Sequence, residues 1–390
     1  MAPTDISWVG IPLEFFLFGL TLLGIAIMHQ RAFEVALAGL IVIVIYKVAA
    51  QDLNLFVHLQ HEWSLLLNLF GLLLGFAILA RHFEESRLPE FVLRRLPQGW
   101  NGGFVLLALT WLISVFLDNI AAAIIGGVIA KQVFNNRVSV SYIAALVAAA
   151  NAGGAGSVIG DTTTTMMWIA GVPALQVAHA FIASTVALVF SGVIASRFQH
   201  RWQPIQNQPD RDEKTLIYTR LGIVAFIIGG VIVSNVLLHF PAAGAWIAIL
   251  LAGLLHPIPW KEAGRALKGS LFLVALVLAA SLMPVKALPD PSWQTVFGLG
   301  WLSAVFDNIP LTALALKQGG YDWGQLAFAV GYGGSMIWFG SSAGVAICNI
   351  FPAGKNTLRW IKEGWHVAAA YILGFFSMLW IMGWHPLHIP

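Results

Sequence analysis

Long apolar runs dominate this sequence and determine the solvent in which it can fold. A transmembrane helix needs roughly 20 mostly apolar residues, and several stretches of the chain have that character. We predict ten membrane-spanning segments, at 8–28, 33–50, 64–80, 139–171, 175–196, 219–239, 241–256, 269–284, 323–352 and 367–387. The chain is 58% hydrophobic and 10% charged, whereas soluble proteins carry about 25% charged residues. The composition therefore predicts an all-α integral membrane protein, and it excludes an ordinary enzyme with a solvated surface.

Two further apolar stretches, 103–130 and 292–317, each contain an Asp-Asn pair near the middle. A continuous helix would place that pair deep in the bilayer, where non-helical backbone is tolerated only inside protein or beside a water-filled cavity. We predict that both stretches are re-entrant hairpins. The spans 139–171 and 323–352 are too long for one straight helix and carry glycine clusters midway, so we predict two broken helices.

The order of these segments repeats. Each half contains three spans, a hairpin, a broken helix and a closing span, which predicts a first repeat at 1–196, a polar cytoplasmic linker at 197–218 and a second repeat at 219–390. Five crossings per half is an odd number, so the second repeat is expected to start on the opposite face. Such inverted repeats are typical of secondary transporters.

Positive charge gives an independent test of this topology. Cytoplasmic loops are enriched in Lys and Arg, and the ten-span arrangement places all 21 Lys and Arg residues on one face except Lys47, Lys286 and Lys317. We expect a multi-pass protein of the cell inner (plasma) membrane with both termini outside the cytoplasm. The N-terminal region carries Asp5 and Glu14 instead of the basic residues with which a signal peptide begins, so we expect no cleavable signal peptide. The net charge of +3 reflects this orientation, and no nucleic-acid partner is expected.

The two hairpins share a polar motif. The pattern Ser-x3-Asp-Asn-Ile occurs at 114–120 and again at 303–309. A serine and an aspartate four residues apart share one helical face, and an Asn can turn the chain. Pro310 suits the first turn of the returning helix. Hydroxyl, carboxylate and amide oxygens suit a hard cation, so we predict ion-binding roles for Ser114, Asp118, Asn119, Ser303, Asp307 and Asn308.

The broken helices are expected to supply the other wall of the site. Asn151 and the glycines after it precede Asp161 and Thr162 in the first repeat, and Ser335 lies in the glycine cluster of the second. A carboxylate at bilayer depth is costly, which makes each one a functional candidate. Two alternatives stay open: Asp161 also suits a helix N-cap, and Ser335 also suits small-residue helix packing.

Other chemistries find little support. Cys348 is the single cysteine, and no His-x3-His ligand pair or phosphate-binding loop is present. We therefore expect no enzyme activity, no cofactor and no drive by ATP, which leaves secondary transport. An intramembrane enzyme using two aspartates is a weaker interpretation, because an aspartic dyad needs one paired geometry rather than a duplicated motif with Asn.

At these motifs the sequence resembles the ion transporter superfamily and, within it, the NhaD-type sodium/proton antiporters. The resemblance rests on the first hairpin motif, on the segment 160–168, on 307–311 and on the glycine-serine segments 333–335 and 340–344. It implies two tip-to-tip hairpins, a dimerising scaffold, hence a homodimer, and a transport domain that moves like an elevator. Carried over by motif, the ion-binding residues are Ser114, Asp118, Asn119, Asn151, Asp161, Thr162, Ser303, Asp307, Asn308 and Ser335.

The charge of the site favours a cation as substrate. The superfamily includes carriers of di- and tricarboxylates, arsenite and silicate, so an ion-coupled carrier of an anion or metalloid is the alternative. Asp118, Asp161 and Asp307 would repel such an anion and attract sodium or lithium. We therefore predict sodium/proton antiport, with sodium bound through these three aspartates and with protons competing for the same oxygens.

Overall fold

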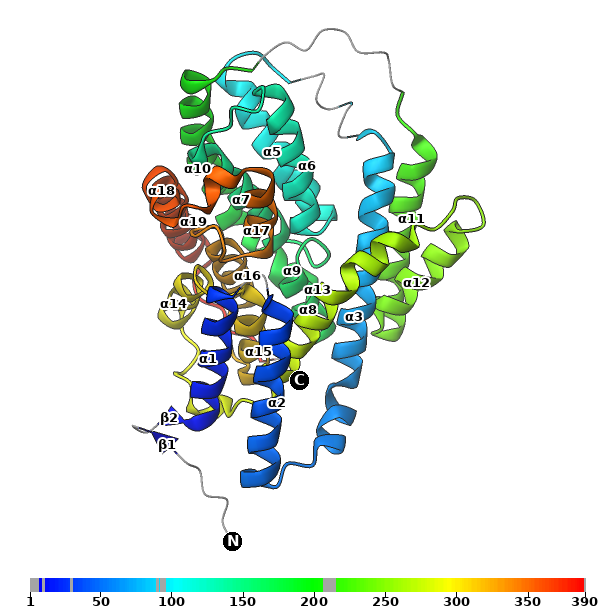
Figure 1. Ribbon diagram of the computed structural model, residues 1–390, viewed down its shortest axis with the longest axis vertical. Coiled ribbons are helices and arrows are strands. Elements are labelled where there is room, and N and C mark those ends of the chain that lie inside the picture. Colours follow the sequence, from blue (N-terminus) through cyan, green and yellow to red (C-terminus); the bar gives the residue numbers. More distant parts are fainter. Residues whose placement is uncertain are drawn as a thin grey trace.

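The computed structural model describes residues 7–8, 11–28, 31–88, 91, 96–205 and 215–388. The described part is almost entirely helical (Figure 1), apart from a small antiparallel pairing of β1 (Ser7–Trp8) with β2 (Ile11–Pro12). The first half contains α1 (Leu13–Ile27), α2 (Ala32–Gln51), α3 (Leu55–Glu85), α5 (Trp100–Phe116), α6 (Asn119–Val133), α7 (Val140–Ala155), α8 (Thr162–Ile169), α9 (Ala174–Ala178) and α10 (Ala180–Trp202).

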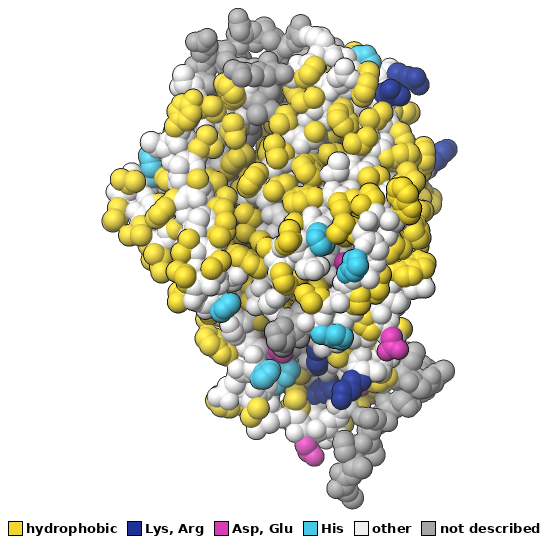
Figure 2. Space-filling view, turned by 180° about the vertical axis from the view of Figure 1, so that it is seen from behind, with side chains coloured by type: hydrophobic (Ala, Val, Ile, Leu, Met, Phe, Trp, Pro, Cys, Tyr) yellow, Lys and Arg dark blue, Asp and Glu magenta, His cyan; other side chains and the backbone are white. Residues whose placement is uncertain are grey.

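The second half contains α11 (Tyr218–Leu238), α12 (Pro241–Ala252), α13 (Trp260–Ser281), η2 (Val285–Ala287), α14 (Trp293–Ser303), α15 (Asn308–Gln318), α16 (Trp323–Gly333), α17 (Ser342–Ile350), η3 (Pro352–Lys355), α18 (Thr357–Glu363) and α19 (Trp365–Met382). Each predicted span therefore contains a helix or a pair of helices. Among the residues that the structure describes, six helices are long and apolar enough to cross a membrane. Figure 2 shows hydrophobic side chains over most of one face, as expected for a surface that contacts lipid.

Several boundaries differ from the sequence prediction. Helix α3 begins at Leu55 instead of 64, and α13 begins at Trp260 instead of 269. Helix α10 continues to Trp202 inside the predicted linker 197–218, because Gln199 accepts a bond from the Ser139 N–H at 2.8 Å and Arg197 lies over the Trp100 ring. Residues 206–214 of that linker lie outside the described residues. Helix α12 has only 12 residues, about 18 Å of helix, so α12 alone is shorter than the predicted span 241–256.

The helices pack as two groups. One group, here the α13 group, consists of α1, α2, α3, α11, α12 and α13, with α13 packed on α2 and α3. The other, here the hairpin group, consists of α5 to α10 and α14 to α19. The groups meet mainly where α13 packs on α15 and where α3 packs on α8. Figure 1 shows α3, α11 and α12 on one side of the molecule and α10, α18 and α19 on the other.

All four predicted interruptions occur. Helices α5 and α6 are separated by Leu117 and Asp118, and α14 and α15 by residues 304–307. Helix α7 ends before α8 begins, and α16 ends before α17 begins. Small residues let these broken ends approach other backbone closely, since a Cβ at Gly153 would lie 2.0 Å from the carbonyl oxygen of Trp111 in α5.

We expect Gly153→Ala to lower the apparent midpoint of thermal unfolding in detergent, because overpacking a close backbone contact costs about 1–3 kcal/mol. Tryptophan fluorescence on heating measures this midpoint. Gly298→Ala in α14 is the matched control, since nothing lies within 4 Å of the added Cβ there. Equal midpoints for the two variants would contradict the close packing of α7 on α5.

Candidate functional site

The three predicted aspartates all occupy the N-cap position of a helix that starts inside the fold. Asp118 precedes α6, Asp161 precedes α8 and Asp307 precedes α15. A helix N-terminus carries unpaired N–H groups and a partial positive charge, which stabilises a carboxylate. Asp161 is therefore both the N-cap of α8 and a residue of the candidate site, so the two alternatives left open by the sequence are compatible.

The backbone at these positions is duplicated between the two halves. Asp118 has φ −49° and ψ 139°, and Asp307 has φ −54° and ψ 143°. Asp161 has φ −143° and ψ 143°, and the N-cap of α17, Ser341, has φ −141° and ψ 152°. The four helix starts thus form two matched pairs, with aspartate at three positions and serine at the fourth.

Asp161 connects the two hairpin motifs. The side-chain amide of Asn119 in α6 donates to Asp161 Oδ1, and that of Asn308 in α15 donates to Asp161 Oδ2, each at 3.3 Å. The hydroxyl of Thr163 donates to Oδ2 at 2.7 Å. Asp161 is only 3% exposed, so this carboxylate is enclosed by donors from three helices.

A second branch runs from Asn119 into the second half of the chain. Asn119 Nδ2 also lies 3.1 Å from Asn151 Oδ1, and Asn151 Nδ2 donates to Ser335 Oγ at 2.9 Å and to Ser341 Oγ at 3.0 Å. All four side chains are buried. The structure therefore brings Asn119, Asn151, Asp161, Asn308 and Ser335 into one hydrogen-bonded network.

Two predicted residues have contacts that the sequence did not indicate, and a third has a neighbour in its place. Ser114 donates to the carbonyl of Ala150 and Ser303 to that of Val330, each at 2.6 Å. These matched bonds fasten each hairpin to its neighbouring broken helix. Thr162 is half-buried, and the threonine hydroxyl that reaches Asp161 belongs to Thr163.

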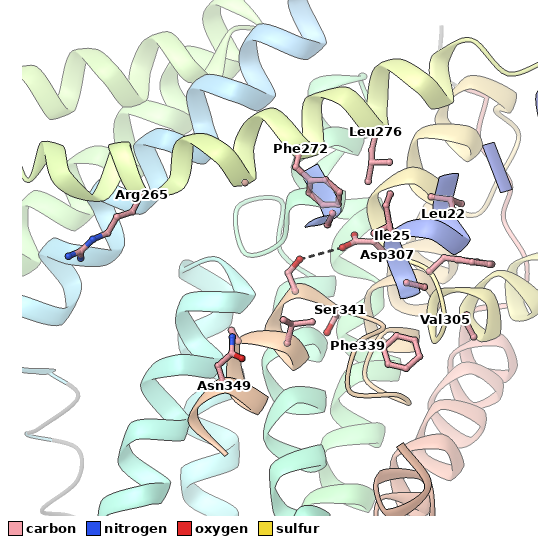
Figure 3. Close-up of a pocket in the computed structure, with 17 residues that line it drawn as sticks. Leu22, Ile25, Arg265, Phe272, Leu276, Val305, Asp307, Phe339, Ser341 and Asn349 are labelled. Carbon is pink, nitrogen blue, oxygen red and sulfur yellow. Dashed lines mark hydrogen bonds between the residues drawn. The ribbon is translucent and has the colours of Figure 1, made fainter. Parts of the chain in front are cut away.

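The two tip aspartates face separate cavities. Asp118 lines a cavity of about 470 Å³ and Asp307 one of about 650 Å³. Figure 3 shows Asp307 between α13 and α17, with its bond to Ser342 dashed; that bond is 3.4 Å, and the Ile309 N–H donates to the same carboxylate at 3.1 Å. Asp118 and Asp307 are half-buried residues, and each lines its own cavity.

The cavities adjoin along α13 and share part of their lining. Arg265, Gly269, Phe272 and Ser342 line both of them. The 470 Å³ cavity is also lined by Arg81, Glu84 and Glu262, and the Arg81–Glu84 and Arg265–Glu262 pairs lie at 3.2 and 2.9 Å. We call Arg81, Glu84, Glu262 and Arg265 the charged mouth.

The three aspartates do not converge on one point. Within the part of the chain that the structure describes, no three His, Cys, Asp or Glu side chains are grouped closely enough to hold a metal ion. That sodium binds through Asp118, Asp161 and Asp307 stays a prediction. In the structure each carboxylate lies at its own helix N-terminus, with the amides of Asn119 and Asn308 against Asp161. One carboxylate with amide and hydroxyl oxygens still suits a hard monovalent cation.

Comparison with known proteins identifies the family. The family described as "Citrate transporter" matches residues 4–333. The chain belongs to this family. The description of the family names a transporter, and several helices of this chain are apolar enough to cross a membrane. The chain is therefore a multi-pass membrane transporter.

Relatives of this family member carry antiporter names. It is 27% identical over 390 residues to "Sodium/proton antiporter 1" of Arabidopsis thaliana, an alignment that covers 85% of this chain and 66% of the relative. It is 25% identical over 340 residues to "Na(+)/H(+) antiporter NhaD" of Alkalimonas amylolytica, covering 72% of this chain and 69% of that protein. The chain thus spans about two thirds of the length of these relatives. The resemblance to NhaD-type proteins is confirmed.

Sequence reasoning left three contributing residues out of the predicted site. Thr163 and Ser341 belong to the network, and Ser342 bonds Asp307. The available signal was their place shortly after Gly160 or Gly340, because a hydroxyl residue after a helix break suits the start of the next helix.

We expect sodium to raise the apparent midpoint of thermal unfolding of this protein, since a ligand that binds the folded state stabilises it. The rise is expected to disappear in Asp161→Asn. Asp322→Asn is the matched control, because Asp322 is also a buried helix N-cap but lies at the start of α16 and bonds the His385 N–H. A sodium-dependent rise that survives in Asp161→Asn and is lost in Asp322→Asn would place the cation elsewhere.

Proposed function

We propose that this protein exchanges sodium, or lithium, for protons across the membrane as a secondary active transporter. One observation carries the proposal: the buried carboxylate of Asp161 is bonded by the amides of both hairpin motifs, Asn119 and Asn308. A single ionisable group is thereby in contact with both halves of the molecule. The antiporter names of the relatives add support.

The hydrogen bonds suggest how cation and proton exclude each other. Ionised Asp161 accepts from two amides and from Thr163. A proton on this carboxyl introduces a donor that faces those donors, so an Asn amide has to turn and present its oxygen instead. Sodium needs the oxygens of the Asp161 carboxylate and of the Asn amides as ligands, and the proton occupies them. Binding of one therefore opposes binding of the other, which couples the two fluxes without a cofactor or a covalent step.

The tip aspartates act before this step. Asp118 and Asp307 each face a cavity, where their negative charge raises the local concentration of cations and disfavours anions. In this proposal they receive the ion from the cavity, Asp161 binds it, and Ser114, Asn151, Thr162, Ser303 and Ser335 keep the surrounding helices in register.

The proposed architecture is a pair of inverted repeats, 1–196 and 219–390, with two re-entrant hairpins and an elevator-type movement of the hairpin group against the α13 group. The matched backbone angles at the two tips support it, as do the matched bonds from Ser114 and Ser303. Inverted repeats exchange their conformations to move a central site between two faces.

The proposed setting is the inner (plasma) membrane, with both termini outside the cytoplasm and two copies forming a homodimer surrounded by lipid. The segregation of Lys and Arg supports the orientation. The family description names citrate transport, so an ion-coupled carrier of an anion or metalloid is the second candidate. The aspartates at both tips favour the cation.

The deciding measurement is transport by purified protein in vesicles with an imposed pH gradient, tested with sodium, lithium, potassium, citrate and arsenite. We expect proton flux with sodium or lithium, and we expect Asp161→Asn and Asp118→Asn to reduce it to the level of protein-free vesicles. Asp52→Asn is the control. Asp52 is exposed at the C-terminal end of α2, and its backbone has the left-handed conformation that Asn also adopts readily. Citrate or arsenite uptake without sodium-dependent proton flux would support the second candidate.

Ion choice is expected to depend on Gly331. A Cβ at this position would lie 3.4 Å from Asp161 Oδ2 and 3.2 Å from the Ala155 Cβ. We expect Gly331→Ala to raise the half-saturating sodium concentration by about three- to tenfold, equivalent to about 0.7–1.4 kcal/mol, and to affect the smaller lithium ion less. Gly229→Ala, with open space around its Cβ, is the control. An equal loss for both ions would show that this glycine does not set ion size.

A further inference from the structure

The end of the molecule away from the charged mouth is closed by contact between α15 and α13. Ile309, Ala313 and Lys317 recur every four residues, so they share one face of α15. Ile309 and Ala313 are buried in the same apolar cluster as Leu276 and Ala280 of α13. This face of the second hairpin is therefore packed directly on the α13 group.

Lys317 ends that face with a charged contact. Its ammonium donates to the backbone carbonyl of Ser281 and, at 2.7 Å, to that of Met283. Carbonyls at a helix C-terminus lack intrahelical partners and carry partial negative charge, so they attract a cation. Ser281 is fixed in turn, because its hydroxyl lies 2.9 Å from His58 Nε2 in α3. One ammonium thus connects the hairpin group to two helices of the α13 group.

The first hairpin lacks this contact. Lys317 follows Asp307 by the same interval as Val128 follows Asp118 in the matching motif. Val128 is 42% exposed, and Ile120 and Ile124 on the same α6 face line the 470 Å³ cavity. This face of α15 is therefore packed and bonded to α13, while the matching face of α6 lines open space that leads to the charged mouth, as the cavity at Asp307 also does.

We propose that Lys317 is a positioning residue that fastens the second hairpin to the C-terminal end of α13 and so favours the conformation in which the ion site opens toward the charged mouth. The inference rests on the proposed alternating-access transport. Apolar surfaces such as Ile309 and Ala313 pack in more than one register, whereas a charged hydrogen bond to two fixed carbonyls is made in only one. The asymmetry between Lys317 and Val128 makes the two access states unequal in free energy.

The test measures access to the cavities directly. A reporter cysteine replaces Gly269, which lines both cavities and has open space around its Cβ, in a chain in which the buried Cys348 is replaced by Ala. A charged, membrane-impermeant thiol reagent is applied from each side of oriented membrane vesicles. We expect Lys317→Met to slow labelling from the charged-mouth side by about three- to tenfold, because fewer molecules occupy that state.

Two variants separate positioning from general damage to the fold. Lys317→Arg keeps the positive charge and the donors, so it is expected to restore most of the labelling. Lys286→Met removes another lysine, exposed in nearby η2, and is expected to label like the parent chain. Complete labelling of every variant after solubilisation in detergent checks that the reporter is intact.

The outcomes distinguish this inference from the proposed antiport. If Lys317→Met labels as fast as the parent chain, the positioning role is overturned. It is also overturned if Lys317→Met labels slowly and Lys317→Arg labels equally slowly. The parent chain is assayed in parallel for sodium-dependent proton flux. A parent without that flux, whose labelling still depends on Lys317, would overturn the antiport proposal and leave the positioning role in place.

Discussion

The structure depends on placing carboxylates inside an apolar fold without leaving their charge uncompensated. Three aspartates meet this constraint in the same way, each at the N-terminus of a helix that begins within the molecule. The partial positive charge and the free N–H groups of those helix ends stabilise the carboxylates. The helix breaks and the proposed ion site are therefore one structural solution, because a continuous helix would offer no N-terminus inside the fold.

Close backbone packing makes these interruptions stable. The hydroxyls of Ser114 and Ser303 bond carbonyls of α7 and α16 just before those helices end, and glycines allow the broken ends to approach neighbouring backbone. The amides of Asn119 and Asn308 then reach the same carboxylate from opposite halves of the chain. A change in the charge of Asp161 would alter contacts of both hairpins at once, which gives the proposed ion binding a direct route to movement of helices.

The sequence predicted the helices and their interruptions well, because apolar length and glycine clusters act locally. It also predicted most residues of the network around Asp161, since a polar motif that occurs twice in apolar surroundings has to be compensated by polar partners inside the fold. The sequence did not predict which side-chain oxygen bonds to which partner. Whether Thr162 or Thr163 faces Asp161, and whether Ser114 bonds a carbonyl or an ion, depends on helix rotation and on contacts between distant segments.

The shared wall of the two cavities has a pharmacological consequence. Gly269 and Phe272 of α13 border the spaces that lead to Asp118 and to Asp307. A small amphipathic cation lodged against this stretch would obstruct both approaches together, although the two aspartates belong to different halves of the chain. Substitutions that confer resistance to such an inhibitor would therefore accumulate on one helix of the α13 group and spare the residues proposed to bind the ion.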